Sequence, residues 1–257
     1  MTAQVSTTVY TSLRDRVVFV TGGASGIGAA IVEAFVQQHA RVAFVDIDTA
    51  AAHQLVERLE GQGPAPLFLR CDLLDIAALR EAIADVGRRV GPIAALVNNA
   101  ANDERHDFDA VTPEYWDRAL NVNLRHQFFA AQAVRPQMRS LGGGSIVNFS
   151  SIAWMSGVRR LAAYTSSKAA VVGLTRTLAV ELGDDNIRVN AIAPGAIMTE
   201  KQLRMWHTEK STADLVARQA IHKRMSELHV APAVLFLASD DSRLITKQCL
   251  IVDGGLR

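Results

Sequence analysis

The segment TGGASGIG at residues 21–28 restricts the possible folds more than any other part of the sequence. It joins an apolar, β-branched run to a segment with helical periodicity at 26–40. Gly22 permits a tight turn, Gly26 lets the main chain approach a pyrophosphate, and Gly28 lets the helix lie close to a sheet. Because the loop stands between a strand and a helix, it predicts a dinucleotide-binding βαβ unit rather than an ordinary tight turn.

Apolar runs typical of strands alternate with helical patterns along the rest of the chain. We expect strands at 17–21, 42–46, 67–72, 94–100, 145–151, 188–194 and 248–255, and helices at 26–40, 49–61, 75–90, 113–138, 163–182 and 230–239. Such alternation forms right-handed βαβ units, and strands that are apolar throughout indicate a sheet covered on both faces. The sequence therefore predicts an α/β fold: a single Rossmann-type, doubly wound domain with a seven-stranded parallel sheet flanked by helices.

The domain organisation follows from the same patterns. Residues 1–12 are expected to be a polar lead-in, and 13–257 a single dinucleotide-binding and catalytic domain. The charged, amphipathic segment 198–228 interrupts the alternation before the last helix, which suggests a substrate lid. No apolar stretch reaches the length of a membrane span, and the N-terminus lacks the apolar core of a signal peptide.

Charge and cysteine usage narrow the class of protein. The chain carries 27 basic and 26 acidic residues, for a net charge of +1, and this balance gives no sign of a nucleic-acid-binding face. Cys71 and Cys249 lie far apart, which fits a reducing compartment and predicts a cytoplasmic protein. The seven histidines show no metal-binding spacing, so we expect no metal.

Residues around the first turn predict the cofactor. Ser25, Gly26 and Ile27 begin the first helix, whose free N–H groups and partial positive charge favour phosphates. Asp46 ends the second strand, where a carboxylate binds the hydroxyls of the adenosine ribose and repels a 2′-phosphate. We therefore expect NAD rather than NADP. Asp72 ends the third strand and would meet the adenine; each aspartate has helix capping as its alternative role.

A second group of residues predicts the chemistry. In YTSSK, Tyr164 and Lys168 are four positions apart and share one helix face. A phenol is a poor base at neutral pH, and a nearby ammonium lowers its pKa, so the pair would act as a general base for an alcohol proton. Y-x-x-x-K alone occurs often by chance. Ser151, 13 residues upstream, and Asn123 in NVNL strengthen the hypothesis.

Together these residues resemble the short-chain dehydrogenase/reductase family, over nearly the whole chain from TGGASGIG to VDGG at 252–255. The resemblance implies NAD(P)-dependent hydride transfer and frequent tetramers. By its motifs, Tyr164 would be the acid/base, Lys168 would hold the nicotinamide ribose, Ser151 would orient the substrate, and Asn123 would hold a water that links Lys168 to solvent. Asn99, Ala100, Pro194, Ile197 and Thr199 would lie along the cofactor. Ala101 departs from the family, which usually has glycine there.

A narrower resemblance concerns the substrate. The segments NDERH (102–106), NLRHQFFAAQAV (123–134), SIAW (151–154) and RMWHT (204–208) look like those of the aldose 1-dehydrogenases, which oxidise the anomeric carbon of a sugar to a lactone. A sugar needs several hydrogen-bonding side chains and a flat apolar surface. The first would come from Asn102, Asp103, Arg105 and His106, and the second from Trp154 and Trp206.

Each substrate-side residue also has an alternative role. Arg105 and Asp103 would form a surface ion pair of little energetic value, His106 would cap the loop, and Trp206 would serve packing. Asn102, which follows the cofactor-lining turn, and Trp154, three residues after Ser151, have the stronger case for contact with substrate.

The sequence thus predicts an NAD-dependent oxidoreductase acting on the anomeric C1 hydroxyl of an aldose, and a homotetramer. The alternative enzyme is an NAD(P)-dependent reductase or dehydrogenase of another secondary alcohol or carbonyl, such as a polyol, a steroid or a 3-oxoacyl thioester. A non-catalytic dinucleotide-binding scaffold is a third hypothesis, which the presence of both Tyr164 and Lys168 disfavours.

Overall fold

A computed structural model describes residues 8–257 and has seven parallel strands in one sheet, ordered β3-β2-β1-β4-β5-β6-β7. The strands are β1 (Val17–Thr21), β2 (Arg41–Asp46), β3 (Leu67–Arg70), β4 (Ile93–Asn98), β5 (Gly144–Phe149), β6 (Ile187–Pro194) and β7 (Cys249–Val252). The helices are α1 (Gly26–Gln37), α2 (Thr49–Arg58), α3 (Ile76–Arg89), α4 (Pro113–Leu120), α5 (His126–Ser140), α6 (Ala153–Ser156), α7 (Ala162–Glu181), α8 (Glu200–Met205), α9 (Glu209–Arg218) and α10 (Ala231–Ala238). The predicted doubly wound fold is confirmed.

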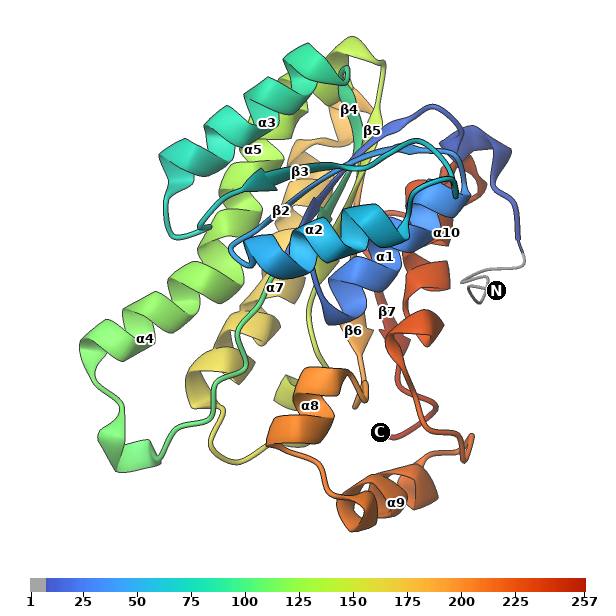
Figure 1. Cartoon of the computed structure of the whole chain (residues 1–257). Helices are drawn as coiled ribbons and strands as arrows, with labels where there is room; N and C mark the ends of the chain where they lie inside the picture. The colour runs from blue at the N-terminus through green and yellow to red at the C-terminus, as the bar shows by residue number, and fades with distance from the viewer. Residues whose placement is uncertain (1–7) are drawn as a thin grey trace.

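Helices cover both faces of the sheet, as the uniformly apolar strands predicted. Every residue of β1 and β4 is buried. One hydrophobic cluster packs the sheet against α1, α2 and α10, and a second packs its other face against α3, α5 and α7. Figure 1 shows these two helical layers on either side of the twisted sheet. The burial of both faces is the main stabilising contribution to the fold.

The strand order reverses at β1, which pairs with β2 on one side and β4 on the other. In open parallel sheets, ligands bind in the crevice beyond the carboxyl ends of the strands at such a point. The loops after β1 and β4 therefore meet at the edge of the sheet where the sequence places its glycine-rich turn and the segment NNAA.

Several predicted strands end earlier in the structure. The strands predicted at 67–72, 94–100 and 145–151 end at Arg70, Asn98 and Phe149. The residues that follow are the polar or small ones that enter the loops at the carboxyl edge. The sequence alone does not separate the last paired residue of a strand from the first residue of its loop.

The long helix predicted over 113–138 is present but not regular. After α4 the chain forms a π-helical turn, η3 (Asn121–Arg125), before α5 begins. A π turn inserts one extra residue into a helix and is often found at functional sites. Asn123 lies in this turn and is fully buried.

The inserted segment 198–228 contains two short helices, α8 and α9, with N-caps formed by the side chains of Thr199 and Thr208. Figure 1 shows α8 near the carboxyl ends of the strands and α9 farther from the sheet. Of the predicted lead-in, residues 1–7 lie outside the described residues, while the Tyr10 N–H donates to Gln38 Oε1 at 2.7 Å. None of the helices formed by residues 8–257 has the length and apolar character needed to cross a membrane.

Candidate active site

The four predicted catalytic residues come from three elements that meet at the carboxyl edge of the sheet. Tyr164 and Lys168 lie on the first two turns of α7, and Ser151 follows β5 by two residues. Asn123 lies in η3, which contacts α7. The Lys168 Nζ is 5.6 Å from the centroid of the Tyr164 ring and donates to the Phe149 carbonyl at 2.8 Å. A phenol, a hydroxyl and an amine are thereby gathered in one place.

The π turn fixes the loop that follows β4. The Asn123 side chain accepts the Asn102 N–H at 2.8 Å and donates to the Asn102 carbonyl at 3.0 Å. It also donates to the Ala119 carbonyl at 2.9 Å. The Asn123 side chain thus holds both the N–H and the carbonyl of Asn102 in place. The position of Asn123 in NVNL does not predict these two hydrogen bonds.

The electrostatics of the centre differ from the sequence expectation. Burial raises the pKa of Tyr164 to about 12; a hydrogen bond with Ser151 opposes this rise, and the charge of Asp103 adds to it. Burial also lowers the pKa of Lys168 to about 7, with Asp103 acting in the opposite direction. The expectation that the Lys168 ammonium leaves Tyr164 with a lowered pKa was wrong for the protein alone, because desolvation of the phenolate outweighs it.

Two neighbours of the centre were missed from sequence. Ser150 Oγ donates to the Lys168 carbonyl at 2.7 Å and accepts the Trp154 Nε1–H at 3.2 Å, so it joins α7 to α6. His126 on α5 is fully buried, and burial together with the nearby Lys168 charge lowers its pKa to about 3. No pattern marks these two residues, because their roles arise only from contacts between distant elements.

The glycine-rich turn is packed closely against the loop that follows β4. Gly22 has φ +66°, and a Cβ there would lie 2.8 Å from the Ala100 Cα. A Cβ at Gly28 would lie 1.8 Å from the Gly22 carbonyl oxygen. The Asn99 side chain donates to the Gly22 carbonyl at 2.8 Å and so ties β4 to the turn. The loops after β1 and β4 are therefore fitted to each other through these glycines.

The N-terminus of α1 is left open for an anion. Its N-cap residue, Ser25, makes no side-chain cap, and the first turn, with Ile27, contains no acidic residue. By contrast, Asp48 caps α2 and Asp75 caps α3 with their side chains. Free N–H groups and the helix dipole favour a phosphate at such an end. The residues of this chain thus fit a dinucleotide cofactor.

Asp46 and Asp72, predicted to bind the adenosine end of the cofactor, are not helix caps, since Asp48 and Asp75 fill those positions. The Asp46 carboxylate accepts the Ala24 N–H at 2.9 Å and the Ile47 N–H at 2.8 Å. Its charge therefore lies against the glycine-rich turn. Asp72 is exposed and accepts the Leu74 N–H at 3.0 Å.

The end of β6 lies against the same turn. A Cβ at Gly26 would be 3.4 Å from the Thr199 Cγ2. The Pro194 carbonyl accepts the Ile152 N–H at 3.1 Å, and Ile197 is buried. The predicted cofactor-lining residues at the end of β6 and in the segment after it, up to the α8 N-cap Thr199, thus lie near the phosphate turn and the segment that carries Ser151.

The structure separates the four polar residues predicted to contact substrate. His106 Nδ1 lies 3.0 Å from the Tyr115 hydroxyl, so that side chain is engaged within its own loop region. Asp103 forms an ion pair with Lys201 on α8 at 3.2 Å and accepts a hydrogen bond from Gln202. The Arg105 guanidinium carbon lies 4.7 Å from the Trp206 ring centroid. The alternative of an Arg105–Asp103 ion pair is therefore wrong.

Asn102 and Trp154 remain as predicted substrate contacts with accessible side chains. Asn102 is exposed, and its side-chain amide lies 3.5 Å from Glu104 Oε2. Trp154 is 37% exposed even though its Nε1–H is bonded to Ser150. An indole that is held at its polar end and open on its ring is suited to contact the C–H face of a sugar.

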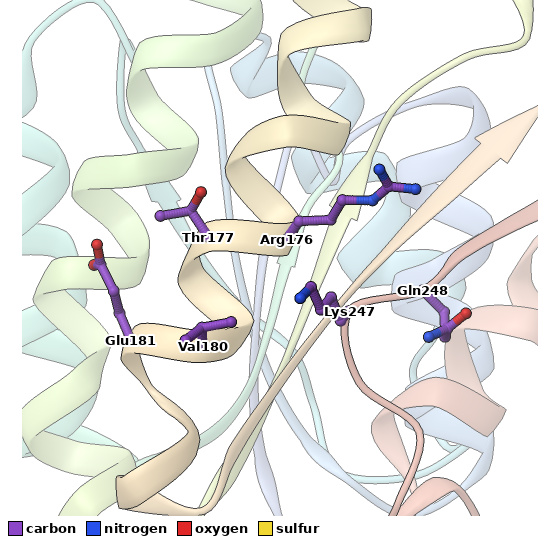
Figure 2. A pocket seen from close by; sticks show the side chains of 6 residues that line it. All are labelled: Arg176, Thr177, Val180, Glu181, Lys247 and Gln248. Atoms are coloured by element: carbon purple, nitrogen blue, oxygen red, sulfur yellow. The ribbon is translucent and has the colours of Figure 1, made fainter.

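A shallow depression of about 810 Å³ lies elsewhere on the surface, over the last two turns of α7 and the start of β7. Figure 2 shows its lining side chains, which include Arg176, Glu181 and Lys247. Arg176 is eight residues beyond Lys168 on α7, or about 12 Å along the helix axis. This depression contains none of the predicted site residues.

Residues 22–257 match the family model described as "Enoyl-(Acyl carrier protein) reductase". The chain is 51% identical to "Probable galactose dehydrogenase GalD" of Rhizobium meliloti (strain 1021), covering 96% of this chain and 97% of that protein. It is 43% identical to "D-xylose 1-dehydrogenase" of Caulobacter vibrioides (strain NA1000 / CB15N), covering 98% and 100%. A short-chain type dehydrogenase/reductase from Mycobacterium ulcerans superposes with a TM-score of 0.90 at 30% identity, covering 95% and 90% of the two chains.

Proposed function

The chain belongs to the short-chain dehydrogenase/reductase family, whose dehydrogenases use nicotinamide cofactors, and we propose that it oxidises the C1 hydroxyl of an aldose to the lactone with NAD. The observation that carries this proposal is a group of polar side chains near Tyr164, namely Asp103, Lys201 and Gln202. Asp103 lies close enough to influence the pKa values of Tyr164 and Lys168, and it is joined to Lys201 and Gln202 on α8. Several hydrogen-bonding side chains in one place suit a substrate with several hydroxyls. The names of the two sugar-dehydrogenase relatives add support.

The chemistry requires one proton and one hydride to leave the C1–OH group. Tyr164 takes the proton, and Ser151, its hydrogen-bond partner, orients the substrate oxygen. The nicotinamide ring, when bound, accepts the hydride, and its positive charge in the oxidised form favours the phenolate. Lys168 would hold the nicotinamide ribose and would pass the proton from Tyr164 to solvent, while Asn123 keeps the π turn in place behind them.

We propose NAD because of the position of Asp46. Its carboxylate is directed to the glycine-rich turn by the Ala24 N–H, where the adenosine ribose would lie. The carboxylate accepts three main-chain N–H groups, from Ala24, Ile47 and Asp48, so its remaining lone pair would accept one ribose hydroxyl, whereas a 2′-phosphate would meet a negative charge. Ser25, Gly26 and Ile27 would hold the pyrophosphate, and Asp72 the adenine. The nicotinamide half would lie along Asn99, Ala100, Pro194, Ile197 and Thr199.

The proposal is tested with a panel of common aldoses, polyols, secondary alcohols and a 3-oxoacyl thioester, each with NAD and with NADP. We expect reduction of NAD, followed at its absorbance, with at least one aldose, and a lactone as the first product. The Asp46→Asn enzyme, which keeps an oxygen for the Ala24 N–H, serves as the cofactor control: its preference for NAD over NADP should fall by about tenfold or more. If no aldose reacts while another alcohol or the thioester does, the substrate assignment is wrong.

The assembly and the substrate lid are further parts of this proposal. Segment 198–228 would open and close over the substrate through α8, since α8 contacts the loop after β4 by side chains alone. A homotetramer is supported by exposed apolar side chains at Leu250 on the edge strand β7 and Phe128 on α5. Two free cysteines suit a reducing, cytoplasmic location.

A further inference from the structure

Arg105 carries a guanidinium without a counter-ion. It forms no ion pair and no hydrogen bond with any residue in 8–257, although the side chain is partly buried. The group lies over the Trp206 ring at 4.7 Å, a cation–π contact that holds it flat. Its natural partner, Asp103, is two residues away but is taken by Lys201 and Gln202 from α8.

Two more buried nitrogen atoms without hydrogen-bond partners lie on Trp206, which contacts this guanidinium, and on the next residue, His207. Arg105 Nε, Trp206 Nε1 and His207 Nδ1 are all buried, and none has a hydrogen-bond partner within the described part of the chain. The pKa of the His207 imidazole is lowered, mainly by burial and to a smaller extent by the charge of Arg105. That second effect indicates that the two side chains are near each other. Buried polar atoms in folded proteins nearly always have a hydrogen-bond partner. Three that lack one, on Arg105, on its contact residue Trp206 and on the adjacent His207, indicate that a polar group from outside the chain belongs there.

The cluster also lies on the side of the site where a substrate would extend. Asp103, whose charge acts on Tyr164 and Lys168, is bonded to Lys201 and Gln202 on α8, and α8 leads into its C-cap residue Trp206, which lies against Arg105. A sugar with its C1 at Tyr164 and its C5 end directed along α8 would reach Arg105. Figure 1 shows α8, which leads directly to Trp206, beside the loop that follows β4.

We propose that Arg105, Trp206 and His207 form a donor subsite for the oxygen-bearing group on C5 of an aldopyranose. The inference rests on the proposed function and adds to it a preference for hexoses or hexuronates over pentoses and 6-deoxy sugars. A guanidinium and an indole N–H can donate to a hydroxymethyl oxygen or, bidentately, to a carboxylate. The oxygen on the C5 substituent of the sugar supplies the hydrogen-bond acceptor that α8 and the loop after β4 do not provide for these side chains.

Two series of sugars, with the galacto and the gluco ring configuration, test this inference. L-arabinose, D-fucose, D-galactose and D-galacturonate share one ring configuration and differ only in the C5 substituent: hydrogen, methyl, hydroxymethyl or carboxylate. D-xylose, 6-deoxy-D-glucose, D-glucose and D-glucuronate form the second series. We expect kcat/KM to rise about tenfold or more between the methyl sugar and at least one oxygen-bearing sugar of the accepted series. The stronger of the two oxygen-bearing sugars identifies the group that the subsite binds.

The variants Arg105→Met and Trp206→Phe remove donors from the cluster, and Arg204→Met is the matched control on the exposed face of α8. We expect the first two to abolish the gain from the C5 oxygen, so that the ratio of kcat/KM for the oxygen-bearing sugar to kcat/KM for the methyl sugar falls to about one. The control should keep the gain. If a variant fails to fold, the comparison of kcat/KM along the two sugar series with the wild-type enzyme still tests the inference.

A flat response of the wild type along both series, or a gain that persists in both variants, would overturn the inference while leaving aldose oxidation intact. If no sugar in either series is oxidised, the subsite assignment fails, whereas the proposed function fails only if the wider aldose panel gives no reaction either.

Discussion

The Tyr164→Phe enzyme is expected to oxidise its sugar about 10²–10⁴-fold more slowly than the wild type, because it loses the group that takes the C1 hydroxyl proton. The substitution removes one oxygen from a side chain on α7 and leaves the ring in place. Burial raises the pKa of Tyr164 to about 12, so the wild-type rate of oxidation should increase with pH as the phenolate becomes more populated. Steady-state kinetics from neutral to alkaline pH should show this rise for the wild type and not for the variant.

Tyr10→Phe is the matched control, since Tyr10 is a partly buried tyrosine that packs against the core away from the site. Its kinetics should equal those of the wild type within about twofold. Binding of the dinucleotide, followed by protein fluorescence, should be unchanged in both variants. Full activity in Tyr164→Phe on the true substrate would contradict the mechanism and favour a non-catalytic role for the tyrosine.

The order of elements could be predicted from sequence because it depends on local patterns. The buried strands are mostly apolar runs, with few polar residues such as Asn148 and Asn190. A Cβ at Gly22 or Gly28 would clash with its neighbours, and Gly26 has φ +52°, which other residues rarely adopt. The spacing of Tyr164 and Lys168 is equally local, since one turn of helix fixes their common face. These features are encoded within a few residues, and the structure reproduces them.

Contacts between distant segments could not be predicted in the same way. Asp103 has an arginine two residues away, yet it pairs with Lys201 and Gln202, which are 98 and 99 residues away in sequence. The π turn around Asn123 depends on the main chain of Asn102, and no residue preference announces it. The sequence therefore identified the residues of the substrate side without their partners.

The pKa of Tyr164 shows a second limit, which is energetic. From sequence only the Lys168 charge was visible, and it predicted a lowered pKa. In the folded chain the phenol and the amine are both buried, so the charged form of each loses its hydration. The pKa of Tyr164 therefore rises and that of Lys168 falls, and both groups are held in their neutral forms more readily. The effect of one charge on another can be expected from two residues in the sequence, but desolvation depends on all the residues that pack around the group in the fold.

Buried Lys168 should therefore reduce the stability of the fold that it serves. Its side chain is 1% exposed and its Nζ donates to one carbonyl, that of Phe149. The folded-state pKa is lowered to about 7 from 10.5, so between these values the unfolded chain binds the proton more tightly. The free energy of unfolding of the wild type accordingly rises with pH across this window, and the cost of burying the ammonium is fully present below it.

Lys168→Met should raise the free energy of unfolding at neutral pH and below, by an amount on the order of a few kcal/mol, while lowering kcat at least about 10²-fold. Loss of the hydrogen bond to Phe149 offsets only about 1 kcal/mol of this gain. Denaturant titrations at about pH 6 and about pH 10 should show a large difference between variant and wild type at the lower pH and a small one at the higher. An equal difference at both values would mean that Lys168 has an ordinary pKa in the folded protein, and that its ammonium is stabilised by contacts other than the single carbonyl at Phe149.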